Sequence, residues 1–110
     1  MRGIGVSEFG GPEALKVVDL PEVHSGSGQM RIRVHAATVN PTDTGLRSGA
    51  RAGTARENST LYIPGMDVAG MIDEIGSGTS TDLAVGDAVM AMVIPRESHG
   101  AYRESVVLAV

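Results

Sequence analysis

The sequence predicts a mainly β domain, a small barrel or sandwich in which helix is the minority. Three observations favour this fold class. The chain has 110 residues, enough for one domain with one modest core. Its fifteen glycines and five prolines indicate many tight turns. Two tyrosines and one phenylalanine supply little bulky core material, so short strands joined by turns suit this composition.

The first half of the chain carries two strand patterns separated by a loop. Residues 14–21, ALKVVDLP, are rich in β-branched side chains and end at a proline, which predicts a strand. Residues 24–29, HSGSGQ, are turn formers and predict the corner that follows. In residues 30–36 apolar side chains alternate with two arginines and His35, the period of a half-buried strand whose polar side chains face solvent.

A short helix or loop is expected after this strand. Residues 40–49, NPTDTGLRSG, open with a turn-forming Asn-Pro pair, and Thr42 or Asp43 can cap one helical turn through its side-chain oxygen. Residues 50–60, ARAGTARENST, are polar and without periodicity, which predicts a mobile loop with its arginines in solvent.

Three further strands complete the pattern. Residues 68–76, VAGMIDEIG, form the first, in which Gly70 lets another backbone approach closely. Residues 76–78, GSG, lack the third glycine and the apolar helix of a dinucleotide-binding turn, so they predict a hairpin loop. Residues 88–94, AVMAMVI, predict a buried strand, and residues 100–110 predict the last strand.

Composition and charge exclude several classes of function. The net charge of −4 provides no field that attracts phosphate backbones, so nucleic acid is not an expected partner. No apolar run approaches the roughly 20 residues of a membrane span, and the first residues lack the apolar core of a signal peptide. We therefore expect a soluble, cytoplasmic protein that does not enter a membrane.

The chain offers few ligands for a metal ion. It has no cysteine, which rules out disulfides and thiolate zinc sites built from this chain. Its three histidines, His24, His35 and His99, are scattered without a ligand spacing such as H-x-x-x-H. No metal site is therefore expected.

Four motifs follow one another in a characteristic order. They are VNPTD (39–43), RSG (47–49), PGMDVAGMIDEIGSG (64–78), and VGDAV (85–89) with GAYRES (100–105). Together they resemble the N-terminal domain of the zinc-independent quinone oxidoreductases, within the medium-chain dehydrogenase/reductase superfamily. The opening FGGPEALKVVDLP is also similar to that family, and the resemblance covers nearly the whole chain apart from residues 50–61.

This resemblance implies a GroES-like, partly open β-barrel with short helices, in which residues 1–110 form the substrate-side domain. In the full enzyme such a barrel packs against a Rossmann domain that holds NADPH. The strand, glycine-rich turn and helix of that domain are not found in order here, so it is expected downstream. The implied reaction is hydride transfer from the nicotinamide C4 to a quinone or an α,β-unsaturated carbonyl, with this domain inactive alone.

The same resemblance argues against a catalytic zinc. The related zinc alcohol dehydrogenases carry a cysteine and a Gly-His-Glu motif where this chain has Asn40 and GMD (65–67). The amide of Asn40 and the thioether of Met66 thus replace a thiolate and an imidazole, which removes two zinc ligands. Hydrogen bonds must then polarise the substrate, or the substrate must accept hydride without a metal, as quinones and enones do.

Three residues are candidates for cofactor contact in the full-length protein. Asn40 can donate and accept hydrogen bonds near the nicotinamide ribose, but it also suits a plain turn before Pro41. Asp43 stands where the family motif has its aspartate. It can pair with Arg47 four residues later if the segment is helical, a bracing role that we prefer to catalysis.

Asp67 is the acid of the PGMD turn. Its first interpretation is a structural brace, because a Pro-Gly turn flanks it. A role in organising water or neighbouring donors in the cleft ranks second, and a role as metal ligand ranks last.

One departure from the family concerns a phenol donor. The quinone oxidoreductases usually carry a tyrosine between the NPTD-like and RSG-like pieces, where this chain has Gly45 and Leu46. We hypothesise that the hydroxyl of Tyr62 reaches the cleft instead, as the catalytic donor. The alternative is that Tyr62 covers the barrel edge, and Tyr102 is expected in the core or at the edge of the last strand.

Two other functions stay open. A GroES-like binding or assembly module without catalysis would need a mobile apolar loop, whereas residues 50–60 are polar. An enoyl reductase domain of a larger polyketide-type synthase would share this domain, and the sequence does not separate it from a free-standing quinone reductase. Residues that choose NADPH over NADH, and the contacts of a homodimer, would lie in the missing half.

Overall fold

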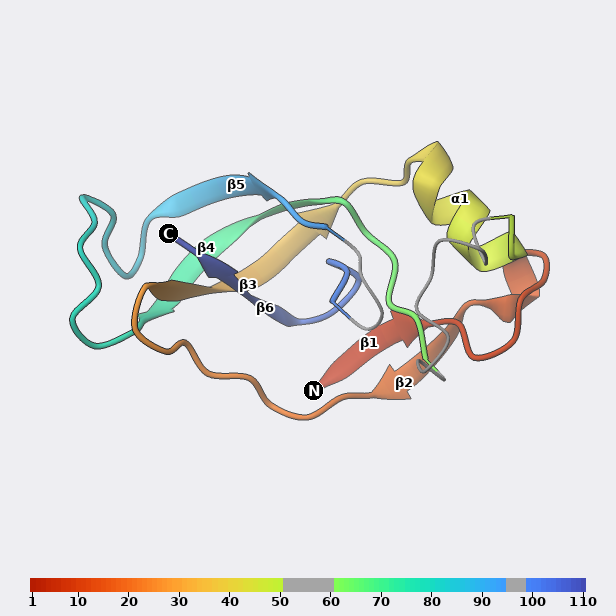
Figure 1. Cartoon of the computed structure of the whole chain (residues 1–110), viewed down its shortest axis with the longest axis horizontal. Helices are drawn as coiled ribbons and strands as arrows, with labels where there is room; N and C mark the ends of the chain where they lie inside the picture. The colour runs from red at the N-terminus through yellow and green to blue at the C-terminus, as the bar shows by residue number, and fades with distance from the viewer. Residues whose placement is uncertain (51–60, 95–98) are drawn as a thin grey trace.

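The computed structural model of the chain describes residues 1–50, 61–94 and 99–110. Its strands form two antiparallel sheets that lie along the long axis of the molecule (Figure 1). The larger sheet has the order β5 (Ala88–Met92), β4 (Asp67–Ile75), β3 (Gln29–Ala37) and β6 (Ser105–Ala109). The smaller sheet pairs β1 (Arg2–Gly5) with β2 (Lys16–Asp19). The predicted mainly β, partly open fold is confirmed.

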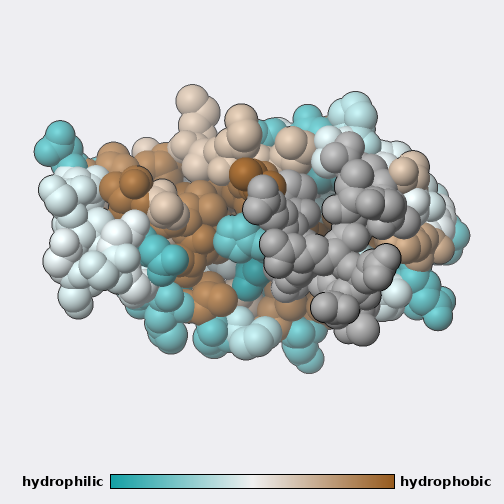
Figure 2. Space-filling view, in the orientation of Figure 1, coloured by the Kyte–Doolittle hydropathy of each residue, from teal (hydrophilic) through white to brown (hydrophobic). Residues whose placement is uncertain are grey.

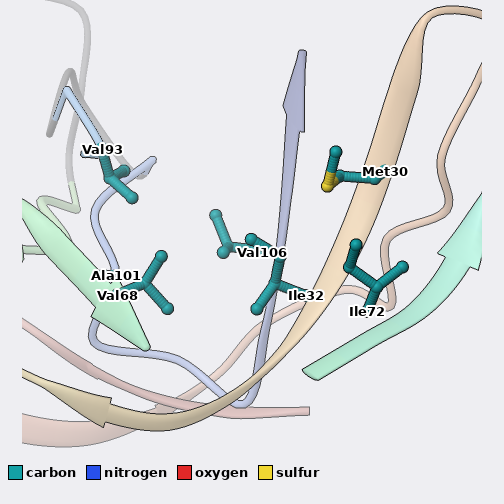
Figure 3. Packing of buried hydrophobic residues seen from close by; sticks show 7 residues of the cluster. All are labelled: Met30, Ile32, Val68, Ile72, Val93, Ala101 and Val106. Carbon is teal, nitrogen blue, oxygen red and sulfur yellow. The ribbon is translucent and has the colours of Figure 1, made fainter. Parts of the chain in front are cut away.

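The main hydrophobic core lies on one face of the larger sheet. Apolar and polar residues alternate along β3, so that Ile32 is buried while Arg33 and His35 are exposed, as the period of the sequence predicts. Figure 3 shows the core side chains converging from the sheet and from the segments that follow β5 and precede β6. They are Met30, Ile32, Val68, Ile72, Val93, Ala101 and Val106.

Gly70 brings β4 close to β3. A Cβ atom at this position would collide with the backbone carbonyl of Arg33 on β3. The predicted close approach of another backbone is therefore confirmed, and only glycine fits there.

The strand predicted over residues 88–94 is present as β5, but the prediction that it is buried is wrong. β5 lies at the margin of the larger sheet, and among the described residues it pairs only with β4. Met90 is 86% exposed and Met92 is 73% exposed, whereas Val93, just after the strand, is 1% exposed. An apolar run does not distinguish a strand covered on both faces from one covered on a single face, which explains the error.

The smaller sheet was only half predicted. β2 lies within the strand expected over residues 14–21, but nothing in the glycine-rich start of the chain predicted β1. A bridge between Val6 and Tyr62 continues the path of β1 beyond the sheet. Next to it, Val6, Tyr62 and Leu46 form a second cluster of buried apolar residues.

The predicted short helix is α1 (Pro41–Ser48), which ends at Gly49 in the left-handed conformation. Its N-cap is Asn40, not Thr42 or Asp43 as predicted. Pro41 keeps the residue before it extended, which places the cap one residue ahead of the proline. Apart from Ala50, the loop predicted over residues 50–60 lies outside the described residues. No helix that is described could cross a membrane.

Candidate functional site

Three polar side chains meet where β3 ends and β4 begins. Thr38 follows β3, Asn40 caps α1, and Asp67 is the first residue of β4. Asn40 Nδ2 donates to Thr38 Oγ1 at 2.9 Å and to Asp67 Oδ2 at 3.1 Å. Thr38 Oγ1 donates in turn to Asp67 Oδ2 at 2.9 Å. We call these three side chains the polar cluster.

Asp43 supports the polar cluster through the backbone. Its side chain is buried, with 4% of the residue exposed. Oδ2 accepts a hydrogen bond from the backbone N–H of Asn40 at 2.8 Å, and Oδ1 accepts one from Gly65 N–H at 2.7 Å. Both oxygens therefore hold backbone groups, which ties the start of α1 to the PGMD turn.

The predicted pair between Asp43 and Arg47 is wrong. In the part of the chain that the structure describes, no ion pair joins the two side chains, although α1 does place them one turn apart. The carboxylate is held by backbone N–H groups instead, and Arg47 Nε is buried with no hydrogen-bond partner among the described residues. The bracing role preferred for Asp43 is present, but its partners are Asn40 and Gly65.

The PGMD turn depends on the conformation of Gly65. This glycine has a φ of 110°, and a Cβ there would lie 2.7 Å from the backbone nitrogen of Ala101. Ala101 N donates to Gly65 O at 3.0 Å, and Tyr102 N donates to Pro64 O at 3.0 Å. The turn therefore docks the segment before β6 beside the polar cluster.

Tyr102 reaches the site, which the sequence did not predict. Its hydroxyl donates to the backbone carbonyl of Thr38 at 3.1 Å. Burial, and next to it the nearby carboxylate of Asp43, together raise the pKa of Tyr102 to about 12. The phenol thus stays protonated at neutral pH. Its place in the GAYRES motif was the available signal, because that motif belongs to the family pattern.

Tyr62, the hypothesised donor, packs in the second apolar cluster. The residue is 9% exposed, contacts Val6 and Leu46, and stacks on Phe9 with ring centroids 5.6 Å apart. This position agrees with the alternative that Tyr62 covers the sheet edge. A catalytic role for its hydroxyl stays a prediction.

An apolar hollow of about 520 Å³ adjoins the polar cluster. Thr38 and Asp67 are the polar residues among its described lining, and Asp67 Oδ1 takes no part in the bonds that join the cluster. The lining residues are Ala36, Ala37, Thr38, Asp67, Val68, Ala69, Met90, Ala91 and Met92. A flat apolar ring with hydrogen-bonding substituents matches such a combination.

The described neighbours of the Asp67 carboxylate are hydrogen-bond donors. Within residues 1–50, 61–94 and 99–110, no group of three His, Asp or Glu side chains is placed to hold a metal ion. The neighbours of its carboxylate are an amide and a hydroxyl, and both donate hydrogen bonds to it. The first interpretation, a structural brace, agrees with this geometry.

Comparison with known proteins places the chain in a family. The model of the alcohol dehydrogenase GroES-like domain matches residues 26–108. The chain belongs to this family. Its fold is the GroES-like domain of the medium-chain dehydrogenase/reductase superfamily, as the motifs imply, and the resemblance to quinone oxidoreductases is confirmed.

Among the relatives, the chain is 47% identical over 85 residues to the quinone oxidoreductase of Rattus norvegicus, covering 73% of this chain and 24% of the relative. It is 36% identical over 103 residues to the chloroplastic NADPH-dependent alkenal/one oxidoreductase of Arabidopsis thaliana, covering 91% of this chain and 25% of the relative. The quinone oxidoreductase structure from Coxiella burnetii superposes with a TM-score of 0.84 at 34% identity, covering 99% of this chain and 34% of that structure's chain. The GroES-like domain described here thus spans a quarter to a third of these relatives.

Proposed function

We propose that this chain is the substrate-side domain of an NADPH-dependent, zinc-free oxidoreductase that transfers hydride to a quinone or an α,β-unsaturated carbonyl. Family membership supports an oxidoreductase. The observation that carries the proposal is the polar cluster beside an apolar hollow, built from the NPTD and PGMD motifs. Both acceptor classes are included because one relative is named for quinones and another for alkenals and enones.

The residues of the site fit a nicotinamide cofactor. The side chains of Ala36, Ala69 and Met92 offer an apolar wall for a flat ring. Asp67 Oδ1 is free of the bonds within the polar cluster and can accept a hydrogen bond from a ribose hydroxyl. NADPH, when bound, supplies the hydride from C4 of its nicotinamide.

The remaining residues orient these groups. Asn40 holds Asp67 and Thr38 together, and the buried carboxylate of Asp43 sets the backbone of Asn40. We therefore assign Asp43 a positioning role and leave direct contact of Asp43 or Arg47 with the cofactor as a prediction. Tyr102, which keeps its proton, holds the carbonyl of Thr38 and so fixes the edge of the site.

A second domain is part of the proposal. In the part of the chain that is described, α1 begins at an Asn-Pro cap and no glycine-rich turn leads from a strand into a helix. The pyrophosphate of NADPH would therefore be held by a Rossmann domain outside these residues. We expect the 110-residue chain alone to oxidise no NADPH. A cytoplasmic location and a homodimer of the full-length protein stay predictions.

The test uses the domain joined to its nucleotide-binding remainder. NADPH oxidation is followed with a benzoquinone and with an alkenal as acceptors. Asn40→Ser keeps a helix N-cap but removes the amide that donates to Asp67, so kcat/KM should fall by roughly ten- to one-hundredfold, the loss of a hydrogen bond to a charged group. Thr44→Ala, on the exposed side of α1, is the matched control and should leave kcat/KM unchanged.

Two results would count against the proposal. If neither acceptor supports NADPH oxidation, the reaction is wrong. If both variants behave like the unmodified protein, the reaction stands but the polar cluster is not its site.

A further inference from the structure

Asp67 brings a negative charge to the hollow of about 520 Å³. It is the only charged residue among the described lining residues, and the others are Thr38 and apolar side chains. Most of the lining comes from strands of the larger sheet, and Figure 2 shows hydrophobic residues gathered over the part of the molecule that this sheet occupies. A single carboxylate thus borders a largely apolar space.

The charge of Asp67 is not balanced by a neighbouring cation in the part of the chain that is described. Its two hydrogen-bond donors, Asn40 Nδ2 and Thr38 Oγ1, are a neutral amide and a neutral hydroxyl. None of the ion pairs between described residues includes Asp67, whereas Asp73 on the same strand pairs with Arg31 at 2.7 Å. The polar cluster therefore fixes the position of the Asp67 carboxylate without cancelling its charge.

An unbalanced charge acts more strongly beside an apolar hollow than in open water. The energy between two charges grows as the effective dielectric constant around them falls. A ligand that fills the hollow displaces water, so less water separates the ligand from the carboxylate. The hollow should therefore favour a ligand, or a form of a ligand, that carries positive charge on the part that lies inside.

Hydride transfer creates a positive charge of this kind. The C4–H bond of the reduced nicotinamide breaks, both of its electrons leave with the hydrogen, and the neutral ring becomes a cation. The acceptor gains the hydride and with it one negative charge, which a proton from water then cancels. The phosphates keep their charge throughout, so the two redox forms of the cofactor differ in charge at the ring alone.

We propose that Asp67 determines the specificity of the site for the redox form of the cofactor, by stabilising the cationic, oxidised nicotinamide relative to the neutral, reduced one. The inference rests on the proposed function, because that function places the nicotinamide in the hollow. Stabilising the oxidised form lowers the reduction potential of the bound cofactor, which makes bound NADPH a stronger hydride donor. The same charge stabilises the ring as it becomes positive in the transition state.

Direct binding of NADP⁺ and of NADPH tests this role without turnover. The domain joined to its nucleotide-binding remainder is titrated with each nucleotide in a calorimeter, with no acceptor present. Asp67→Asn keeps the shape of the side chain and one oxygen acceptor but removes the charge. It should weaken the binding of NADP⁺ relative to NADPH by roughly tenfold, as for a partly screened pair of charges. For a two-electron couple, this change raises the reduction potential of the bound cofactor by about 30 mV.

Two control variants separate the charge of Asp67 from other effects. Asp73→Asn removes the same charge from the same strand, but six residues further along, roughly 20 Å away at about 3.3 Å per residue. This distance exceeds the screening length of about 8 to 10 Å, so the ratio of the two dissociation constants should not change. Thr38→Val keeps the charge of Asp67 and removes one hydrogen bond to it, so the ratio should stay within about twofold.

The outcomes distinguish this inference from the proposed function. If the protein binds neither nucleotide, the proposed function is wrong and the inference falls with it. If both nucleotides bind and Asp67→Asn leaves their ratio unchanged, or if Asp73→Asn or Thr38→Val shifts the ratio equally, the inference alone is wrong. Asp67→Ser also removes the charge and should shift the ratio in the same direction, and it takes the place of Asp67→Asn if circular dichroism shows that variant to be unfolded.

Discussion

Replacing Asp43 with asparagine exchanges one buried carboxylate oxygen for an amide NH2 group and leaves the shape of the side chain intact. In the protein, the two carboxylate oxygens accept hydrogen bonds from Asn40 N–H at 2.8 Å and from Gly65 N–H at 2.7 Å. Asparagine keeps one acceptor, but its amide group turns a donor toward the other backbone N–H. One charge-assisted bond is lost, and one buried donor is left unpaired.

The expected magnitude follows from these two contacts. A hydrogen bond to a charged group is worth about 1.5 to 3 kcal/mol, so Asp43→Asn should lower the free energy of unfolding by about that amount. Asp43→Ala removes both bonds and should cost about 3 to 5 kcal/mol. For a domain of this size, the asparagine variant should melt roughly 10 °C lower, taking about 4 to 8 °C per kcal/mol.

Thermal and urea unfolding, followed by circular dichroism, provide the assay. Asp87→Asn is the control, because Asp87 also accepts a backbone hydrogen bond, from Ala84 N–H at 2.9 Å, but in an exposed turn. Its loss should be within about 1 kcal/mol, as for an ordinary turn contact. If Asp43→Asn is no more destabilising than Asp87→Asn, the reasoning that Asp43 braces the site is refuted.

Three further predictions concern other parts of the molecule. The backbone N–H and hydroxyl of Ser25 hold the pKa of Glu74 at about 2. A carboxyl group whose pKa is lowered by folding stabilises the folded protein at pH values above its ordinary pKa, and this stabilisation is lost as the pH falls toward 2. The urea midpoint of the protein should therefore drop more steeply with acid than that of Glu74→Gln, and parallel curves would contradict this. A catalytic Tyr62 hydroxyl predicts a lower kcat/KM for Tyr62→Phe in the full-length protein, and an unchanged value removes Tyr62 from the site. Gly70→Ala should cost more than about 3 kcal/mol by steric collision between strands, whereas Gly78→Ala, with φ of 70° and open space around it, should cost about 1 kcal/mol; equal denaturation midpoints would refute the close packing.

Local patterns predicted much of the fold. Three features were predicted because they depend on residue type and on neighbours along the chain. They are the alternation in β3, the Asn-Pro start of α1 and the close approach at Gly70. β1 was missed because two of its four residues are glycines, and the strand exists through pairing with β2, from Gly5 with Lys16 to Arg2 with Asp19. The prediction that β5 is buried was wrong for a related reason, because the residues that could cover a strand lie elsewhere in the chain.

The candidate site likewise combines residues that the sequence predicted with contacts that only the fold brings about. The sequence singled out Asn40 and Asp67, but their hydrogen bond joins residues 27 positions apart and exists because β3 and β4 pair, which brings the end of β3 beside the start of β4. Asp43 was expected to pair with Arg47, the nearest opposite charge along the helix. The fold instead brought Gly65 to its carboxylate, and a buried backbone N–H left without an acceptor is costly.

By itself, the sequence determined the family and the mainly β class, because residue identities and their spacing carry that information directly. Only the tertiary structure decided which groups meet: the polar cluster, the docking of Tyr102 onto Thr38, the packing of Tyr62 against Phe9, and the exposure of β5. The physical reason is that a hydrogen bond or an apolar contact depends on distance in space. In an antiparallel sheet, distance is set by register and twist between strands that are far apart in the chain.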